Sequence, residues 1–419
     1  MSSRSERPVS RRSASTIFYT LALGSGVMRT FSVSFDIVAL NTVNIDYLAY
    51  GFLAQWTSFV VTLLVLLFLS IRRTIHGKKR SLGYSLDPDF GRLRLLPKKP
   101  MIYILIAGVF AGISVLCYYL LAGSSDASTV LPYGQLVIIY LLIGDLLAEK
   151  DTPTIIEVQS IVSILFGVLL VGATPSGFDA VTLLIVLVPL NVSSALVTYY
   201  QRLTKRYELS PGLHVDSLNM RIWTLLILNI VMSLLALPFM SVSSWQSMSM
   251  QFMSLLGYMV GGSITAFFSI VMYVRALGRG KMAVVNSLSS ISVVLGIPVT
   301  LIGNFLFPGA FGVIDADAFL WSLKIFGIIL VMIGVVALEA SDVRSLVLIH
   351  VKPLTGDLLP KLFEIKGVES AAALAGPHDY MLKIRSRNLT KTRSLILKKI
   401  QKIEGIRDVE TLVVMKEYN

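Results

Sequence analysis

Residues 48–71 read LAYGFLAQWTSFVVTLLVLLFLSI, an apolar run without a charged side chain. Nine further apolar runs of about twenty residues lie between residues 17 and 340. Roughly 20 helical residues cross a bilayer core about 30 Å thick. Lipid cannot hydrogen-bond to backbone amides and carbonyls, so a segment that crosses the core must satisfy them itself, as a helix does. The composition agrees, because a chain of 419 residues with 54% hydrophobic and 15% charged residues is too apolar for a soluble domain. The sequence therefore predicts a polytopic membrane protein with ten helical spans.

The predicted spans cover residues 17–40, 48–71, 101–122, 127–147, 153–173, 179–199, 221–240, 252–277, 282–306 and 318–339. Residues 1–16 form an arm that carries Arg4, Arg7, Arg11 and Arg12. The apolar run after this arm is too long for the core of a signal peptide and lacks a clear small-residue cleavage site. We therefore expect a retained basic arm on the cytoplasmic side.

Lysine and arginine are unevenly distributed among the segments between these spans. The gaps after spans 1, 3, 5, 7 and 9 hold none, whereas the arm and the other gaps, counted together with Arg221 and Arg275 at the adjoining span ends, hold 21. Because basic segments stay on the cytoplasmic side, this bias predicts a multi-pass protein of the cell membrane with both termini in the cytoplasm. These basic segments also account for most of the net charge of +12, and anionic lipid headgroups attract them. The charge therefore does not require a nucleic-acid partner.

An internal repeat relates the two halves of the apolar region. Residues 108–132 align with residues 262–286 without a gap, and the identical pairs include Gly108 with Gly262, Tyr119 with Tyr273, and Ala122 with Ala276. Because five spans separate the copies, the second copy runs in the opposite direction through the bilayer. The pattern predicts an inverted repeat of five plus five helices, residues 17–173 and 179–340, with a substrate site near the midplane.

The first span carries a polar stripe. Its members are Ser25, Arg29, Ser32 and Asp36, which share one helical face at i, i+4, i+7 and i+11. Arg29 and Asp36 are separated by about 10 Å of helical rise, which suits the two ends of a zwitterion. The alternative is that Arg29 pairs with another helix and only fixes packing.

Other spans carry polar residues that are candidates for the same site. Asn191, Ser194 and Thr198 follow Pro189 at helical spacing and either line a cavity or hydrogen-bond between helices. The remaining candidates are Tyr119, Gln135, Tyr273, Asn286, Ser289 and Ser290. For the two tyrosines, a place in the aromatic belt at the membrane surface is the alternative.

The spans and the repeat resemble the EamA-like branch of the drug/metabolite transporter superfamily. The motifs that carry the resemblance are Tyr118-Tyr119-Leu-Leu-Ala122, Ser128-Thr-Val-Leu-Pro132 and the Glu149-Lys150 pair that closes span 4. The resemblance implies alternating-access export or uptake of small metabolites, often amino acids, without a bound cofactor. The second copy has Gly303-Asn304 where a repeated acidic pair would stand, so we assign Glu149 to a helix cap or an ion pair with Lys150.

Enzyme signatures do not stand out in the sequence. The four histidines lack metal-ligand spacing, and neither a Walker A element nor a GxSxG element occurs. We therefore expect no enzyme, no ATP-driven pump and no cofactor.

Residues 344–419 change to a charged, alternating pattern. Strands are predicted at 346–351, 368–375, 380–385 and 408–415, and helices at 357–366 and 389–403. This βαββαβ order is that of a small α+β ferredoxin-like domain, and Gly367 and Gly405 follow the two helices as caps.

This tail resembles the effector-binding domain of Lrp/AsnC-type regulators. The resemblance rests on Gly376-Pro-His378-Asp379-Tyr380 and on Gly405-Ile-Arg-Asp-Val-Glu-Thr411. It implies dimerisation and binding of an amino-acid effector near the first of these segments, at Gly376, His378, Asp379 and Tyr380. The helix-turn-helix of such regulators is absent from the sequence, so DNA binding does not carry over.

Together these patterns favour a secondary transporter, an exporter of small polar metabolites such as amino acids, that is a homodimer regulated by its tail. The alternative is a membrane-anchored amino-acid sensor whose spans have lost transport. A pure anchor needs neither the repeat nor the polar stripes.

Overall fold

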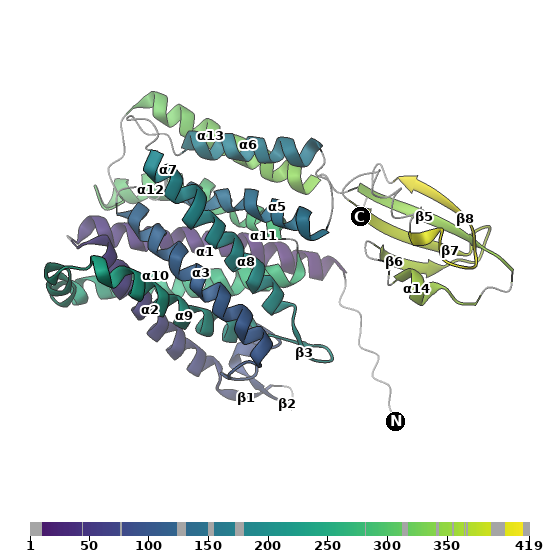
Figure 1. The fold of residues 1–419 in the computed structure, drawn as a ribbon, viewed down its shortest axis with the longest axis horizontal. Coiled ribbons are helices and arrows are strands. Elements are labelled where there is room, and N and C mark those ends of the chain that lie inside the picture. The colour runs from purple at the N-terminus through teal and green to yellow at the C-terminus, as the bar shows by residue number, and fades with distance from the viewer. Residues whose placement is uncertain are drawn as a thin grey trace. The chain divides into compact units, whose positions relative to one another are not determined.

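The structure is a computed structural model. It describes residues 11–43, 45–75, 78–123, 131–149, 155–171, 180–280, 282–311, 317–340, 343–353, 356–363, 365, 368–386 and 399–413. The chain divides into two compact units, one made of Met1–Asp151 with Ile161–Val335 and the other of Thr152–Ser160 with Val336–Asn419. The first unit is helical and the second carries a sheet (Figure 1).

The helices of the apolar region are α1 (Arg11–Thr42), α2 (Tyr47–Leu69), α3 (Lys98–Ala122), α5 (Val137–Glu149), α6 (Ile155–Val171), α7 (Ala180–Ile185), α8 (Asn191–Lys205), α9 (Ser217–Ala236), α10 (Val242–Arg279), α11 (Met282–Ser289), α12 (Ile291–Leu306) and α13 (Ala318–Ala340). Two short hairpins lie between helices, one of β1 (Arg72–Ile75) and β2 (Lys78–Ser81), the other of β3 (Glu208–Ser210) and β4 (Leu213–His214).

Seven helical segments of the described chain are long and apolar enough to cross a membrane. They are Ile17–Thr42, Tyr47–Leu69, Lys98–Ala122, Val181–Lys205, Ser217–Phe239, Val242–Arg279 and Met282–Leu306. Three shorter apolar helices, Leu131–Gly144, Val162–Val171 and Ala318–Gly334, coincide with the predicted spans 127–147, 153–173 and 318–339. The helical unit is therefore compatible with a membrane protein, and a crossing at the three shorter helices stays a prediction.

Local sequence explains where several helices begin. Asp46 accepts a hydrogen bond from the Ala49 amide at the start of α2, and Asp216 accepts one from the Asn219 amide at the start of α9. Such side chains satisfy amides that have no partner inside the helix. At α10 the Ser241 side chain and the Ser244 amide form one half of a reciprocal capping box.

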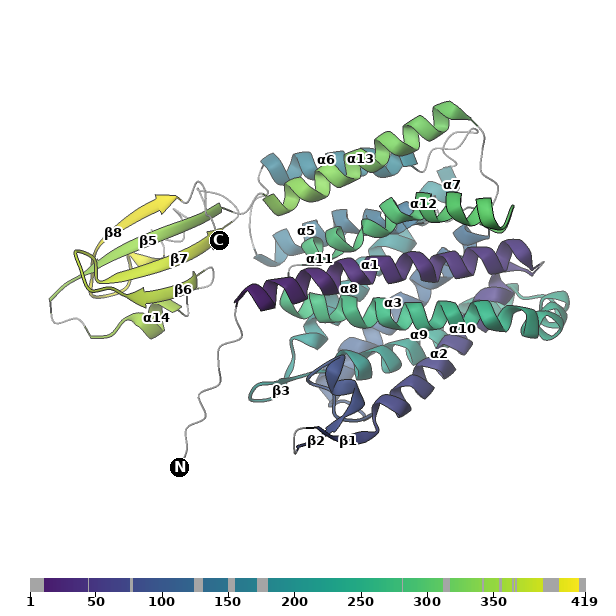
Figure 2. The same cartoon turned by 180° about the vertical axis from the view of Figure 1, so that it is seen from behind.

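Close approach between helices depends on glycines. The helix α1 lies between α10 on one side and α11 and α12 on the other (Figures 1 and 2). A Cβ atom at Gly26 of α1 would lie 2.3 Å from the Ser289 carbonyl oxygen. In α6 and α13 the contact is reciprocal, because a Cβ at Gly167 would lie 2.5 Å from the Gly327 oxygen and a Cβ at Gly327 would lie 2.5 Å from the Gly167 oxygen. Larger side chains at these positions would force the helices apart.

Three interruptions break the regular helices near the middle of the unit. The residues before α5 include a 3-10 turn at Gly134–Leu136, and a turn at Ser290 separates α11 from α12. Between α7 and α8, the stretch Val186–Leu190 is π-helical and contains Pro189. Proline lacks the amide that a regular helix needs, and π turns are common at functional sites.

The second unit contains a four-stranded antiparallel sheet in the order β6-β7-β5-β8. Its elements are β5 (Val343–Val351), α14 (Leu359–Phe363), β6 (Val368–Ala373), β7 (Tyr380–Ser386) and β8 (Ile406–Val413). All four predicted strands are present. Of the predicted helix 357–366, the residues Leu359–Phe363 are helical, and residues 364 and 366 lie outside the described residues. The predicted helix 389–403 and the cap at Gly367 lie largely or wholly outside the described residues.

The sheet buries one face. Val347, Ile349, Leu382 and Ile384 alternate along the two central strands and form a core with Leu362 of α14. This alternation is the period-two pattern of a half-buried sheet. Gly405, which the sequence places as a helix cap, has φ of 100°, a conformation that a residue with a side chain rarely adopts.

Candidate functional site

A cavity of about 320 Å³ lies inside the helical unit. It is lined by side chains from α1, α2, α3, α5, α8, α9, α10 and α11, which are far apart in the sequence. This volume falls within the usual range of about 300–1,000 Å³ for small-molecule pockets. Nine of the predicted site residues line it: Ser25, Arg29, Ser32, Asp36, Ser194, Thr198, Tyr273, Asn286 and Ser289.

The polar stripe of α1 forms one wall of the cavity. All four of its members face the cavity, as the helical spacing predicts. The Ser32 hydroxyl donates to the Gly262 carbonyl oxygen at 3.2 Å, so it also joins α1 to α10. The Ser25 hydroxyl donates to Ala22 of its own helix at 2.7 Å.

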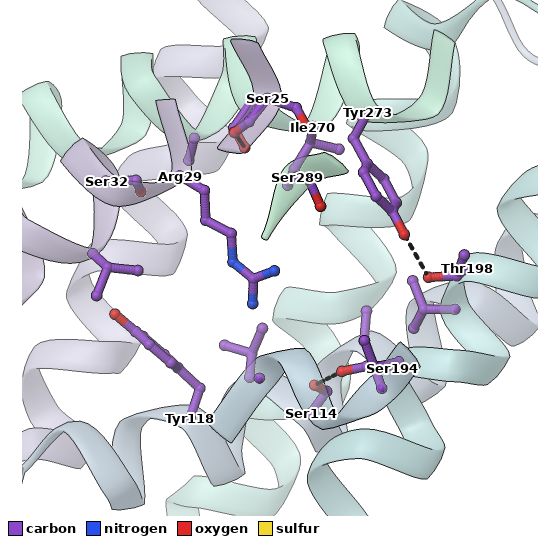
Figure 3. A pocket seen from close by; sticks show the side chains of 18 of the residues that line it. Ser25, Arg29, Ser32, Ser114, Tyr118, Ser194, Thr198, Ile270, Tyr273 and Ser289 are labelled. Atoms are coloured by element: carbon purple, nitrogen blue, oxygen red, sulfur yellow. Dashed lines mark hydrogen bonds between the residues drawn. The ribbon is translucent and has the colours of Figure 1, made fainter. Parts of the chain in front are cut away.

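Arg29 extends from α1 into the cavity, between Tyr118 and the pair of Tyr273 and Thr198 (Figure 3). No hydrogen bond or ion pair joins its guanidinium to another residue of the described chain. A Cβ at Gly134 would lie 2.7 Å from an Arg29 Nη atom, so glycine leaves room for the guanidinium. The packing alternative for Arg29 required a partner on another helix, and the described residues supply none.

Asp36 is held differently, because both of its carboxylate oxygens are hydrogen-bonded. Tyr50 donates to Oδ1 at 2.8 Å and Tyr118 donates to Oδ2 at 2.9 Å. The two hydroxyls fix the carboxylate at the wall of the cavity. Arg29 and Asp36 therefore share the cavity without forming an ion pair with each other.

Hydroxyl groups line the wall opposite the stripe. Ser114 of α3 and Ser194 of α8 are hydrogen-bonded at 2.8 Å, and Thr198 bonds Tyr273 of α10 at 3.2 Å (Figure 3). The Tyr273 hydroxyl also donates to Asn286 at 3.3 Å. Hydroxyls donate or accept as a ligand requires, so this wall can bind polar groups of either kind.

Four predicted site residues do not line the cavity: Tyr119, Gln135, Asn191 and Ser290. Tyr119 is buried against Tyr50, and its hydroxyl accepts from Gln55 at 3.2 Å. Tyr119 is thus enclosed by protein and does not lie on the outer surface of the helical unit.

Gln135 and Asn191 are occupied by contacts between helices. Gln135 accepts from Ser290 at 2.9 Å and from Asn286 at 3.3 Å, and so joins the two interrupted helices. Asn191 donates to the Tyr133 carbonyl at 2.9 Å and, at 2.6 Å, to the carbonyl of Val186, the first residue of the π-helical stretch. For Asn191, these contacts fit the alternative in which it hydrogen-bonds between helices better than the one in which it lines a cavity.

Several lining residues were not predicted. Ala111, Ser114, Val115, Tyr118 and Leu121 form one face of α3. Their spacing of three or four residues is a helical signal, but α3 is apolar on all sides, so its sequence does not mark this face. Arg221 was counted among the basic residues of a loop, although it lies in the first turns of α9 with a buried side chain.

A second polar cluster lies where the ends of α8 and α9 meet the segment after α2. The Lys205 ammonium donates to Asp87 at 3.0 Å, to Asp89 at 3.1 Å and to the Val215 carbonyl at 2.9 Å. Burial raises the pKa of Asp87, but the Lys205 charge and the hydrogen bonds from Ser217 outweigh burial, so this pKa lies below its ordinary value. All three ammonium donors of Lys205 are thus satisfied.

Asp216 lies beside this cluster and behaves in the opposite way. Burial raises its pKa to about 6, against the hydrogen bonds from Asn219 that favour the charged form. Arg94 is its nearest basic partner, at 3.8 Å, and is partly exposed.

In the sheet unit, the four predicted effector residues lie at and just before the start of β7. The Asp379 carboxylate accepts from the Val351 amide at 2.8 Å, and His378 lies 3.2 Å from Glu410. The Tyr380 hydroxyl accepts from the Leu358 amide at 3.3 Å. Gly376 has open space where a side chain would begin. Asp379 and Tyr380 therefore hold neighbouring segments of this unit together, whether or not they contact a ligand.

Comparison with known proteins identifies the tail. Residues 346–419 match the family model described as Lrp/AsnC ligand binding domain. The match spans the four strands of the sheet, so the chain carries this domain at its C-terminal end, and the domain suggests binding of a small-molecule effector such as an amino acid. No EamA-like family model matches the helical unit, and no curated protein matches the chain.

Proposed function

We propose that the chain is a secondary transporter that exports small polar metabolites, with amino acids as the first class to test, by alternating access. The observation that carries the proposal is the cavity, a polar site with a guanidinium at its centre inside a bundle of apolar helices. Charged groups at membrane depth are costly and mark substrate or ion pathways. The proposed cycle uses no cofactor and no catalytic step.

The proposal includes ten spans arranged as an inverted repeat of the EamA-like kind. The helix interruptions support the repeat. Shifting Gly134–Leu136 by the 154 residues that align Gly108 with Gly262 places this turn on residues 288–290, where α11 ends. Both broken helices thus turn at equivalent positions, as expected where a discontinuous helix lines a transport site.

The pairing of helices also supports the repeat. In the proposed repeat, α1 corresponds to α8, α2 to α9 and α3 to α10. The contact of α1 with α10 then has its counterpart in the contact of α8 with α3, and the contact of α2 with α10 has its counterpart in the contact of α9 with α3. Both members of each pair of contacts are present. Because α5 corresponds to α11 and α12, the contact of α5 with α8 likewise has its counterpart in the contacts of α1 with α11 and α12.

We further propose that both termini are cytoplasmic, on the evidence of the charge bias. Ser85 and Ser243 are exposed and lie on opposite proposed sides, so single cysteines can be placed there after replacement of Cys117. An impermeant thiol reagent added to intact cells should label Ser243→Cys and not Ser85→Cys. The reverse pattern would invert the topology.

The tail is proposed to bind an amino acid and to dimerise, so that the transporter is a homodimer. The face of the sheet opposite its core supports dimerisation, since it carries the apolar side chains of Leu346, Leu348, Met381 and Leu412, which are half-buried or exposed. Light scattering of the full chain in detergent should give the mass of a dimer. A monomer at all concentrations would remove dimerisation from the proposal.

The flux of metabolites into proteoliposomes tests the transport function. Panels of amino acids, nucleosides and sugars should include a substrate whose flux falls roughly tenfold or more in Arg29→Ala, because a charge-assisted hydrogen bond is lost. Arg73→Ala is the matched control, since Arg73 is exposed in the β1–β2 hairpin. Flux indistinguishable from protein-free vesicles for every compound would favour the alternative, a membrane-anchored sensor.

A further inference from the structure

The charged side chains of the cavity form an uneven set. Among the described residues that line it, three are charged: Arg29, Asp36 and Arg221. They come from two helices, α1 and α9, and together carry two positive charges and one negative charge.

Neither guanidinium is neutralised by a carboxylate of the residues that the structure describes. Arg221 is only 6% exposed, and its Nε has no hydrogen-bond partner. No ion pair joins either arginine to a carboxylate of the described chain. A buried cation without a counter-charge is unfavourable, and the planar guanidinium is suited to bidentate binding of a carboxylate. Each arginine is therefore ready to bind an acidic group of a ligand.

Asp36 retains capacity for a basic group. Each of its oxygens accepts one tyrosine hydroxyl, and a carboxylate oxygen has two acceptor directions. An ammonium group in the cavity can therefore donate to Asp36 without displacing Tyr50 or Tyr118.

The complement of two guanidiniums and one carboxylate is a molecule with two acidic groups and one ammonium group. We propose that the cavity selects an acidic amino acid, with its carboxylates at Arg29 and Arg221 and its ammonium group at Asp36. This inference rests on the proposed function and narrows the substrate class of the same site. The hydroxyls of Ser114, Ser194 and Thr198 can add hydrogen bonds to the same carboxylate and ammonium groups.

Matched ligands test the charge pattern directly. The probes are glutamate, glutamine, which lacks its side-chain carboxylate, and glutarate, which lacks its ammonium group. Aspartate, 2-aminoadipate and lysine complete the set. Binding is measured by thermal shift of the purified full-length protein, and flux is measured in proteoliposomes. We expect the best acidic amino acid to bind roughly tenfold or more tightly than its amide and than the diacid without the ammonium group.

Variants separate the cavity from the tail, which is also proposed to bind an amino acid. Arg221→Gln and Arg29→Gln should each weaken binding of the acidic amino acid roughly tenfold or more. Arg221→Gln should also reduce the ratio of the affinity for glutamate to that for glutamine. Asp36→Asn should reduce the ratio of the affinity for glutamate to that for glutarate. Arg73→Gln is the matched control and should leave all affinities unchanged, because Arg73 is exposed outside the cavity.

The outcomes distinguish this inference from the proposed function. Tight binding and flux of neutral or basic amino acids, insensitive to Arg221→Gln, would overturn the inference and leave transport standing. Binding of an acidic amino acid that depends on both arginines, without flux, would support the site and overturn transport. If no acidic amino acid binds the wild-type protein, the inference is wrong, and this result does not depend on the folding of any variant.

Discussion

Two basic side chains of the helical unit, Lys205 and Arg29, are treated in opposite ways. Lys205 is buried and bonded to two carboxylates and a carbonyl oxygen. Arg29 points into a cavity with no such partner in the described chain. A buried charge that the protein pairs ties segments together, whereas one that it leaves unpaired is costly until a ligand supplies the missing charge. The comparison separates a structural cation from a binding cation by their partners.

The largest expected effect is the loss of Lys205. In Lys205→Met the carboxylate of Asp87 stays buried without its cation, which should lower the free energy of unfolding by about 3–5 kcal/mol. Thermal unfolding in detergent measures this loss. Lys98→Met is the control, because Lys98 is exposed. Equal melting temperatures for the two variants would mean that the Lys205 cluster does not stabilise the fold.

Asp216 extends the comparison to pH. Its pKa of about 6 lies above the unfolded value of about 3.9, so the folded state binds more protons between these values. The contribution to stability is therefore complete below about pH 4 and is lost as the pH rises through 6, by up to about 3 kcal/mol. Asp216→Asn should flatten the pH dependence of the melting temperature in this window. A wild-type curve that rises from pH 4 to pH 6.5 in step with the variant would contradict the assignment.

Arg29 should respond to substitution in the opposite sense to Lys205. In the substrate-free protein, Arg29→Met removes an unpaired charge and should raise the free energy of unfolding by about 1–2 kcal/mol. The melting temperature without ligand measures this gain. A fall as large as that in Lys205→Met would show that Arg29 has a structural partner.

The smallest expected effect concerns the tail. Asp379→Ala removes the acceptor of the Val351 amide, which should cost about 1 kcal/mol of local stability, because one partly exposed hydrogen bond is lost. Hydrogen exchange of the Val351 amide in the full chain reports this change. Protection equal to that of the wild type would indicate that the bond does not persist in solution.

The sequence predicts some parts of the site and not others, for physical reasons. The α1 stripe is visible because polar residues at helical spacing stand out in an apolar run. The α3 face is not visible, because Tyr118 lies among apolar neighbours on every side of its helix. Arg221 looks like a loop residue because it lies close to the start of α9.

Contacts between distant segments are also beyond sequence patterns. Lys205 meets Asp87 across more than one hundred positions, and periodicity describes only neighbours along one helix or strand. For the same reason the sequence suggests a cavity position for Gln135 and does not reveal its hydrogen bond with Ser290. The strands of the tail are easier to predict from the sequence, because alternation and turn residues are local signals.

The reciprocal contact of Gly167 and Gly327 has a consequence for how the chain can vary over generations. A new side chain at either position meets the carbonyl oxygen of the other, so each position favours glycine whatever residue occupies the other one. Tolerance at one site would require a prior shift of the opposite helix, which is a change in many residues at once. One close approach between two helices therefore restricts both positions, although 160 residues of sequence separate them.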